Sequence, residues 1–184
     1  LGVLLHFNRF RMKRAVVAVL NALMALPTVV VGLLVFSLIS RSGPLGQLNM
    51  LFSPAGVIIG QVILSSPILI SLVFSGLSRM DSRFYETLIT LGAKQRDVLI
   101  ASLVEGRFVI ISAILAGFGR VIGEVGVSMM LGGNIRWYTR TMTTSIALET
   151  SKGEFELGLA LGMILMIIAL AVNGIIHSLV KSDA

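Results

Sequence analysis

The sequence predicts an all-α protein that crosses a membrane several times. Only 13% of its 184 residues are charged and 55% are hydrophobic, against about 25% and 45–50% in soluble domains, and the mean hydropathy is +0.95. Four apolar runs reach the roughly 20 residues that a helix needs to cross about 30 Å of hydrocarbon. They are residues 15–40, 55–78, 108–132 and 157–180. We therefore expect at least four transmembrane helices in one membrane domain over residues 1–184.

Each run predicts one continuous helix. Pro27 and Pro67 lie inside the first and second runs, and helices in lipid tolerate proline when neighbouring helices supply the missing hydrogen bonds. The sequence starts at Leu1 with "LGVLLHF", which reads like the end of a further apolar helix. We therefore also expect an N-terminal helix to be missing.

The basic residues orient the spans. Ten of the fifteen lie on one side of the four runs, four lie on the other side, and Arg120 lies inside the third run. The ten are Arg9, Arg11, Lys13, Arg14, Arg79, Arg83, Lys94, Arg96, Arg107 and Lys181, and the four are Arg41, Arg136, Arg140 and Lys152. Because basic loops stay in the cytoplasm, residues 79–107 are predicted to be cytosolic.

Several kinds of chemistry have no residues to carry them. The chain has no cysteine and two isolated histidines, which disfavours disulfides, a Cys nucleophile and a metal site. Neither a phosphate-binding loop of the form G-x-x-x-x-G-K-[ST] nor a G-x-S-x-G or H-E-x-x-H motif is present. The net charge of +6 sits beside apolar runs without interleaved aromatics, so it indicates topology rather than nucleic-acid binding. We expect no catalytic residue, no metal and no cofactor in this chain.

The loop at residues 79–107 predicts two short helices. Phe84, Leu88 and Leu91 recur at i, i+4 and i+7, which is the spacing of an amphipathic helix. Gly92 follows, where a helix ending in the left-handed conformation most often has glycine. A second run at residues 93–104 places Val98 and Ser102 on one face. Periodicity alone leaves open that these helices simply lie on the lipid headgroups.

The stretch "FYETLITLGAKQRDVL", residues 84–99, resembles the EAA loop of ABC importer permeases. The resemblance rests on Glu86 placed six residues before Gly92, within the triplet Leu91-Gly92-Ala93, which Lys94 follows. It implies that these five residues form a coupling helix and turn that dock on a separate ATPase. Two departures from the family pattern stand out. Thr87-Leu88 replaces small alanines, and Val104-Glu105 replaces Leu-Pro.

A second region resembles permeases for molybdate, tungstate and sulfate. Residues 119–149 carry a G-E-x-G motif at 123–126, a G-N-I motif at 133–135 and a T-R-T motif at 139–141. The details of residues 140–162 look most like tungstate permeases. The resemblance implies a type I ABC importer-like helix bundle in the plasma (inner) membrane of a prokaryote, importing an oxyanion by alternating access. The implied partners are an ATPase that binds ATP and Mg²⁺, a second permease copy as a homodimer, an extracytoplasmic oxyanion-binding protein and membrane lipid, but no nucleic acid.

Arg120 and Glu124 are four residues apart within the third run, where a lone charge in lipid costs several kcal/mol. We expect either an ion pair, within the chain or across a subunit interface, or a role in the translocation path. Gly119, Gly123 and Gly126 predict a small-residue face for close helix packing.

The resemblance implies that the side of the outer loop, residues 133–155, meets the binding protein. Asn134, Arg136 and Arg140 are the candidate contact residues. Trp137 and Tyr138 favour a simpler alternative, anchoring at the membrane interface. The Ser/Thr-rich residues 139–150 predict a short helix over the pore.

Two other classes of function remain open at this stage. A secondary transporter often shows inverted repeats, which we do not find in the sequence. A membrane scaffold without ATPase coupling would explain the spans and the polar loop, but not the two ordered motifs.

Overall fold

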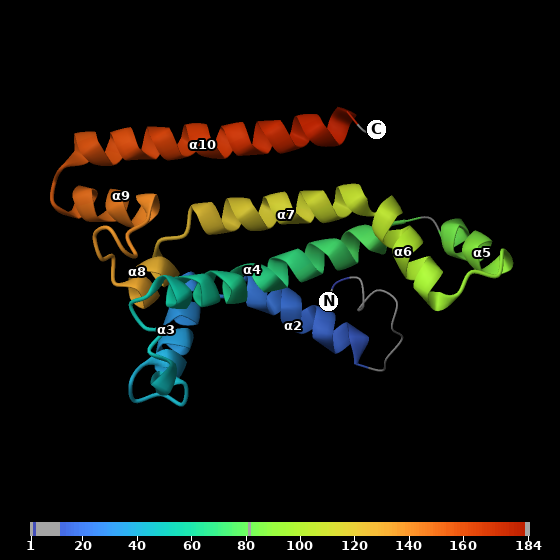
Figure 1. Cartoon of the computed structure of the whole chain (residues 1–184), viewed down its shortest axis with the longest axis horizontal. Helices are drawn as coiled ribbons and strands as arrows, with labels where there is room; N and C mark the ends of the chain where they lie inside the picture. The colour runs from blue at the N-terminus through green and yellow to red at the C-terminus, as the bar shows by residue number, and fades with distance from the viewer. Residues whose placement is uncertain (1, 3–11, 81, 183–184) are drawn as a thin grey trace. The chain divides into compact units, whose positions relative to one another are not determined.

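The computed structural model describes residue 2 and residues 12–80 and 82–182 (Figure 1). These residues form helices and no strand, so the predicted all-α class is confirmed. Apart from Gly2, the apolar N-terminal stretch that predicted a missing helix lies outside the described residues. The chain divides into two compact units: unit 1 holds Leu1–Met24 and Ser66–Gly117, and unit 2 holds Ala25–Ser65 and Phe118–Ala184.

The helices follow one another along the chain with short connections. In order they are α2 (Lys13–Met24), α3 (Thr28–Ile39), the 3₁₀ turn η1 (Gly46–Leu48), α4 (Pro54–Leu77), α5 (Ser82–Thr90), α6 (Gln95–Glu105), α7 (Arg107–Ile122), α8 (Gly126–Gly132), α9 (Met142–Ser151) and α10 (Phe155–Ser182).

The second and fourth predicted spans are confirmed as single long helices. Helix α4 and residues Phe155–Ile176 of α10 are each long and apolar enough to cross a membrane. Pro67 lies inside α4 without ending it. Two consecutive helix pairs, α2 with α3 and α6 with α7, add two further spans if each bent pair is counted as one span. The described residues therefore hold two to four membrane spans.

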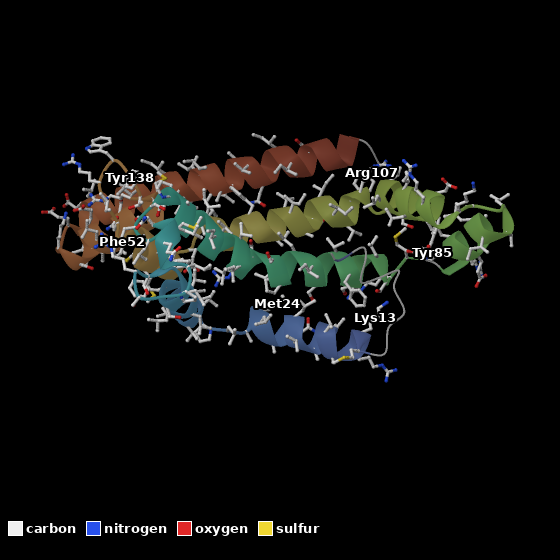
Figure 2. The ribbon with its side chains drawn as sticks, turned by 60° about the horizontal axis from the view of Figure 1, so that its bottom comes forward. Lys13, Met24, Phe52, Tyr85, Arg107 and Tyr138 are labelled. Carbon is white, nitrogen blue, oxygen red and sulfur yellow. The ribbon has the colours of Figure 1, made fainter. Side chains whose placement is uncertain are left out.

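The first predicted span is wrong as one continuous helix. Helix α2 ends at Met24, which Figure 2 labels, and α3 begins at Thr28. Pro27 is extended, with φ −59° and ψ 131°. Proline has no N–H to donate, and it disfavours the helical conformation in the residue before it. Its carbonyl instead accepts the N–H groups of Val30 and Val31, so Pro27 starts α3.

The third predicted span is also interrupted. Helix α7 follows α6 after a 61° bend at Gly106 and ends at Ile122. Residues 123–125 are not helical, and α8 then runs from Gly126 to Gly132. Residues 108–132 are thus a helix, a break and a short second helix.

Each unit has a small core of its own. In unit 2 the buried apolar side chains come from α3, α4 and α8, and they are Val31, Val35, Ile39, Leu64, Val127 and Leu131. In unit 1 they come from α4, α6 and α7, with Leu77, Val98 and Ala113 buried. Many other apolar side chains are exposed, as expected for helices whose solvent is lipid.

Candidate functional site

Helices α5 and α6 meet through a turn at Gly92. Gly92 has φ +77°, in the left-handed region that favours glycine. Its N–H donates to the carbonyl of Ile89 at 3.0 Å, and the N–H of Ala93 donates to the carbonyl of Leu88 at 3.0 Å. This pair of bonds is a Schellman motif, which satisfies the last carbonyls of a helix. The predicted glycine turn is therefore present.

The start of α6 is fixed by its own residues. The Asp97 carboxylate accepts the backbone N–H of Lys94 at 3.0 Å, and the carbonyl of Lys94 accepts the N–H of Val98 at 3.0 Å. Val98 and Ser102 are buried on the predicted inner face of α6. In Figure 1, α5 and α6 form a helical pair that leads into α7.

The turn between α5 and α6 exposes large apolar side chains beside charged ones. Leu91 is 79% exposed and Ile89 is 66% exposed. Gly92 and Lys94 are exposed, Ala93 is partly exposed, and Glu86 is exposed with no ion pair among the described residues. The five residues that resemble a coupling motif are therefore all exposed or partly exposed, and we call them together the turn surface: Glu86, Leu91, Gly92, Ala93 and Lys94.

Arg120 and Glu124 form an ion pair within the chain. Nη1 of Arg120 lies 2.9 Å from Oε2 of Glu124, whose side chain is 3% exposed against 36% for Arg120. The sequence placed Glu124 inside a helix. In the structure it lies outside one, because α7 ends at Ile122. Its Oε1 instead accepts the N–H of Val127 at 3.1 Å. The carboxylate thus satisfies one of the free N–H groups in the first turn of α8, and this bond stabilises the break.

Two partners of this break are not evident from the sequence. The hydroxyl of Thr143 donates to the Glu124 carbonyl at 3.0 Å. Gln61 donates through Nε2 to the hydroxyl of Ser128 at 3.1 Å, between α4 and α8. A hollow of about 370 Å³ lies beside Gln61 and Thr143. A lone polar residue in an apolar run, such as Gln61, indicates that it has a hydrogen-bond partner, but it does not identify that partner.

The three glycines expected to pack closely have different surroundings. A Cβ at Gly126 would lie 3.3 Å from Oε1 of Glu124, from Oγ1 of Thr28 and from Cγ2 of Val29. At Gly119 and Gly123 a Cβ would meet nothing within 4 Å. Of these three glycines only Gly126 is therefore closely packed. The three do not share one helical face, because α7 ends before Gly123.

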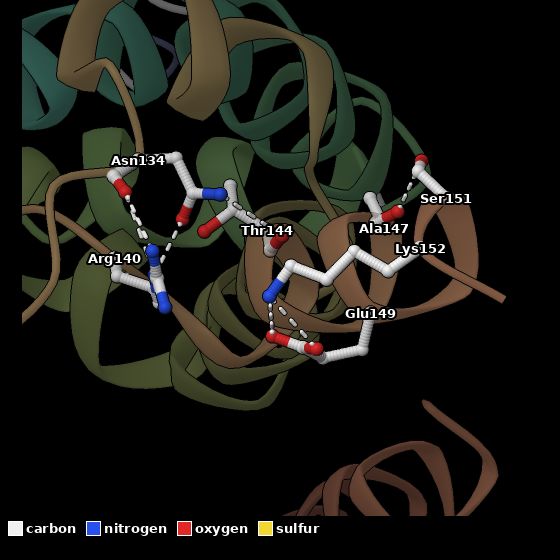
Figure 3. Close-up of polar contacts among 7 residues, drawn as sticks. All are labelled: Asn134, Arg140, Thr144, Ala147, Glu149, Ser151 and Lys152. Atoms are coloured by element: carbon white, nitrogen blue, oxygen red, sulfur yellow. Dashed lines mark hydrogen bonds and ion pairs between the residues drawn. The ribbon is translucent and has the colours of Figure 1, made fainter. Parts of the chain in front are cut away.

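The outer loop holds Arg140 through uncharged acceptors (Figure 3). The Arg140 Nε lies 3.1 Å from Oδ1 of Asn134, and Nη2 lies 3.3 Å from the Asn134 carbonyl. Asn134 in turn donates to the Thr144 carbonyl at 3.4 Å. Arg136 lies with Cζ 5.3 Å from the ring centroid of Trp137, which is 90% exposed. Asn134 and Arg140 are thus brought together, and Arg136 points elsewhere.

The Ser/Thr-rich run forms a helix, as predicted. Helix α9 begins after Thr141, whose hydroxyl accepts the N–H of Thr144 at 3.2 Å. At the other end, Nζ of Lys152 lies 2.9 Å from the Glu149 carboxylate (Figure 3). Whether α9 covers a pore stays a prediction.

Comparison with known proteins decides the family. No family model matches the chain. The tungstate uptake system permease protein TupB of Campylobacter jejuni is 39% identical over 176 residues, covering 96% of this chain and 74% of that protein. TupB of Peptoclostridium acidaminophilum is 38% identical, covering 97% of this chain and 78% of its own length. The chain belongs to the tungstate, molybdate and sulfate permeases of ABC importers. A probable anion ABC transporter permease protein of Haloferax volcanii is also 39% identical, with 92% and 75% covered.

The related proteins also show what class of membrane protein this chain is. The molybdenum and sulfate transport permeases that also match do so at lower identity, from 31% downwards. The chain is therefore a membrane-embedded permease subunit of an ABC oxyanion uptake system. A permease of this class needs a path through the membrane and a surface for its partners, and the broken third span and the turn surface are the structural candidates.

Proposed function

We propose that this permease imports tungstate and is driven by a separate ATPase that docks on the turn surface. The observation that carries the proposal is the Schellman turn at Gly92, which leaves Ile89 and Leu91 in solvent while satisfying its own backbone. Large apolar side chains held in solvent mark a surface for a protein partner. Tungstate is favoured because the two relatives named for tungstate uptake match at 38–39% identity over nearly the whole chain.

The proposed mechanism is alternating access by two copies of the permease. ATP and Mg²⁺ are bound by the partner ATPase, and its closure pulls on the turn surface. The 61° junction between α6 and α7 carries this pull into α7, because Gly106 sits there with Leu77 and Ser102 packed around it. The permease itself carries out no covalent chemistry.

On the opposite side we propose that an oxyanion-binding protein meets Arg136 and Arg140. Arg140 is the better positioned of the two, because Asn134 fixes its guanidinium without neutralising its charge. The location is the inner membrane of a prokaryote, with residues 79–107 in the cytoplasm.

Reconstitution tests the proposal. The full-length permease, its ATPase and its binding protein are placed in liposomes, and uptake of tungstate, molybdate and sulfate is measured with and without ATP. We expect ATP-dependent uptake with tungstate preferred. Uptake that survives ATP removal but collapses with an ion gradient identifies a secondary transporter instead. Failure to copurify with any ATPase identifies a scaffold.

A further inference from the structure

A groove in unit 1 runs along the contact between α4 and α7. In Figure 1 the second half of α4 and the first half of α7 run side by side, and Gly76 of α4 lies so close to Val109 of α7 that a Cβ has no room. Beside this contact lies a groove of about 490 Å³. Its lining is mostly small or apolar and includes Leu72, Ser112, Ala113 and Ala116.

One end of the groove is cationic. Arg79, two residues past the end of α4, is part of the lining, and it is exposed. Within residues 12–80 and 82–182 its guanidinium has no ion pair. Phe108 also lines the groove, and Cζ of Arg107 lies 4.6 Å from the centroid of the Phe108 ring. Arg79 thus lines the groove itself, and Arg107 packs on a ring that lines it.

The length of the groove fits half of a bilayer. Leu72 and Arg79 are seven residues apart, and Phe108 and Ala116 are eight apart, which at 1.5 Å per residue is about 10–12 Å along the helices. The hydrocarbon core is about 30 Å thick, so each leaflet supplies about half of that. The groove therefore opens at the predicted cytosolic surface and ends within the cytosolic leaflet.

We propose that this groove binds one anionic phospholipid of the cytosolic leaflet. Its phosphate lies at Arg79 and Arg107, and one acyl chain lies along Leu72, Val109 and Ala116. Arginine matches phosphate geometrically through paired N–H donors, and basic pockets between membrane helices on the cytoplasmic side suit acidic headgroups. The proposal does not depend on which oxyanion is carried. It depends on residues 79–107 being cytosolic, which is tested separately by labelling.

The charges favour a lipid over a second copy of the chain as the occupant. The predicted cytosolic side carries ten basic residues and five acidic ones, Asp81, Glu86, Asp97, Glu105 and Asp183. A second copy presenting the same side brings like charge to Arg79, whereas an acidic headgroup brings the opposite charge. A hollow of about 330 Å³, also bounded by α4 and α7, has no charged residue in its lining, so it gives no such preference.

Native mass spectrometry of the full-length permease tests the site. The protein in detergent is offered phosphatidylglycerol or phosphatidylcholine with identical acyl chains. We expect one retained phosphatidylglycerol per chain. Arg79→Gln should lower the preference for the acidic lipid about fivefold, the usual effect of one basic residue at an anionic membrane surface. Arg14→Gln, which removes an exposed charge on the same predicted side away from the groove, should leave the preference unchanged.

Two further measurements distinguish the occupants. Ala116→Leu fills the inner end of the groove and should lower retention of both lipids without changing their ratio. A photoreactive benzoylphenylalanine at position 112 should crosslink to lipid. Crosslinking to a second permease copy, displacement of the lipid by millimolar inorganic phosphate, or equal losses in Arg79→Gln and Arg14→Gln would each overturn the proposal.

Discussion

Two of the helix breaks in this chain are of opposite kinds. At Gly92 the turn is exposed, a Cβ there would meet nothing within 4 Å, and its hydrogen bonds stay within residues 88–98. At residues 123–125 the break is buried, and Glu124 joins α7, α8 and α9 through Arg120, Val127 and Thr143. The first break is closed by local hydrogen bonds, and the second is held by bonds to three helices.

This difference separates two ways of using a helix break. An exposed turn that closes on itself keeps its shape with nothing packed on it, so its outer side chains are available to a partner. A buried break joined to several helices transmits any movement of one helix to the others. We therefore propose docking for the Gly92 turn and mechanical linkage for Glu124.

The largest expected effect is an all-or-none difference in labelling between two positions. It tests whether the segments that follow the two breaks lie on opposite sides of the membrane. Because the chain has no cysteine, single substitutions Gln95→Cys and Lys152→Cys can be labelled cleanly. A membrane-impermeant maleimide added to intact cells should label position 152 and not position 95. Labelling of position 95 alone reverses the orientation and removes the basis for docking at Gly92.

Gly92→Val should abolish uptake while leaving the permease in the membrane. A β-branched residue at φ +77° is strongly disfavoured, and asparagine tolerates this region far better. Since nothing surrounds the position, only the backbone conformation distinguishes the two variants. We expect loss of the copurifying ATPase in Gly92→Val and near-normal binding in Gly92→Asn, measured by pull-down and uptake. If the Gly92→Val protein binds the ATPase and transports normally, the docking role is wrong and the turn is only an element that lies on the membrane surface.

The buried ion pair should respond unequally to loss of either partner. Arg120→Gln leaves a 3% exposed carboxylate without its counter-ion, at a cost of about 3–5 kcal/mol in folding free energy. Glu124→Gln leaves the more exposed Arg120 partly hydrated and keeps an acceptor for the Val127 N–H, so we expect about 1–3 kcal/mol. The double variant should be less destabilised than Arg120→Gln alone.

Thermal unfolding in detergent measures these differences. A double variant that folds like the unmodified protein but transports nothing, together with a harmless Glu124→Gln, contradicts the pair as a structural element and assigns Arg120 to the translocation path.

The smallest effects concern the glycines near the second break. Gly126→Ala places a Cβ 3.3 Å from three atoms and should be mildly destabilising. Gly119→Ala lies inside α7 with open space around it, so alanine should stabilise the single chain by about 0.5–1 kcal/mol. If Gly119→Ala instead weakens association of two permease copies in a crosslinking assay, its open face is a dimer contact.

The sequence predicted what depends on local pattern. The extents of α4 and α10 followed from hydropathy, and the α5–Gly92–α6 turn followed from spacing and the position of one glycine. The two wrong continuous spans share a cause, because hydropathy averages over 18 or more residues and does not register a single interruption. A helix break lies at Pro27, which precedes α3, and none lies at Pro67. The presence of a proline therefore does not by itself predict a break.

The contacts of the candidate site depended on tertiary structure. Arg120 and Glu124 were recognised as partners from their spacing, but the capping bond to Val127 required α8 to begin at Gly126. Thr143 and Gln61 had no sequence signal that named their partners, since these lie 19 and 67 residues away. Asn134 and Arg140 were both singled out, yet their mutual contact lies in a folded loop in which Asn134 has a left-handed φ of +50° and the N–H of Arg140 donates to the carbonyl of Ile135.

Helix α10 differs from every other span in how little its own chain constrains it. None of the most apolar 18-residue stretch within Phe155–Ile176 is buried, whereas Val127 and Leu131 of α8 are fully buried. Exchanging Leu, Ile, Met or Val at the exposed positions of α10, such as Leu159, Met166 and Leu170, changes little packing within the chain and keeps the affinity of the helix for lipid. Among related permeases, the residues of α10 should therefore vary widely in identity while their hydropathy stays constant. The buried residues of α8 should instead keep their identity.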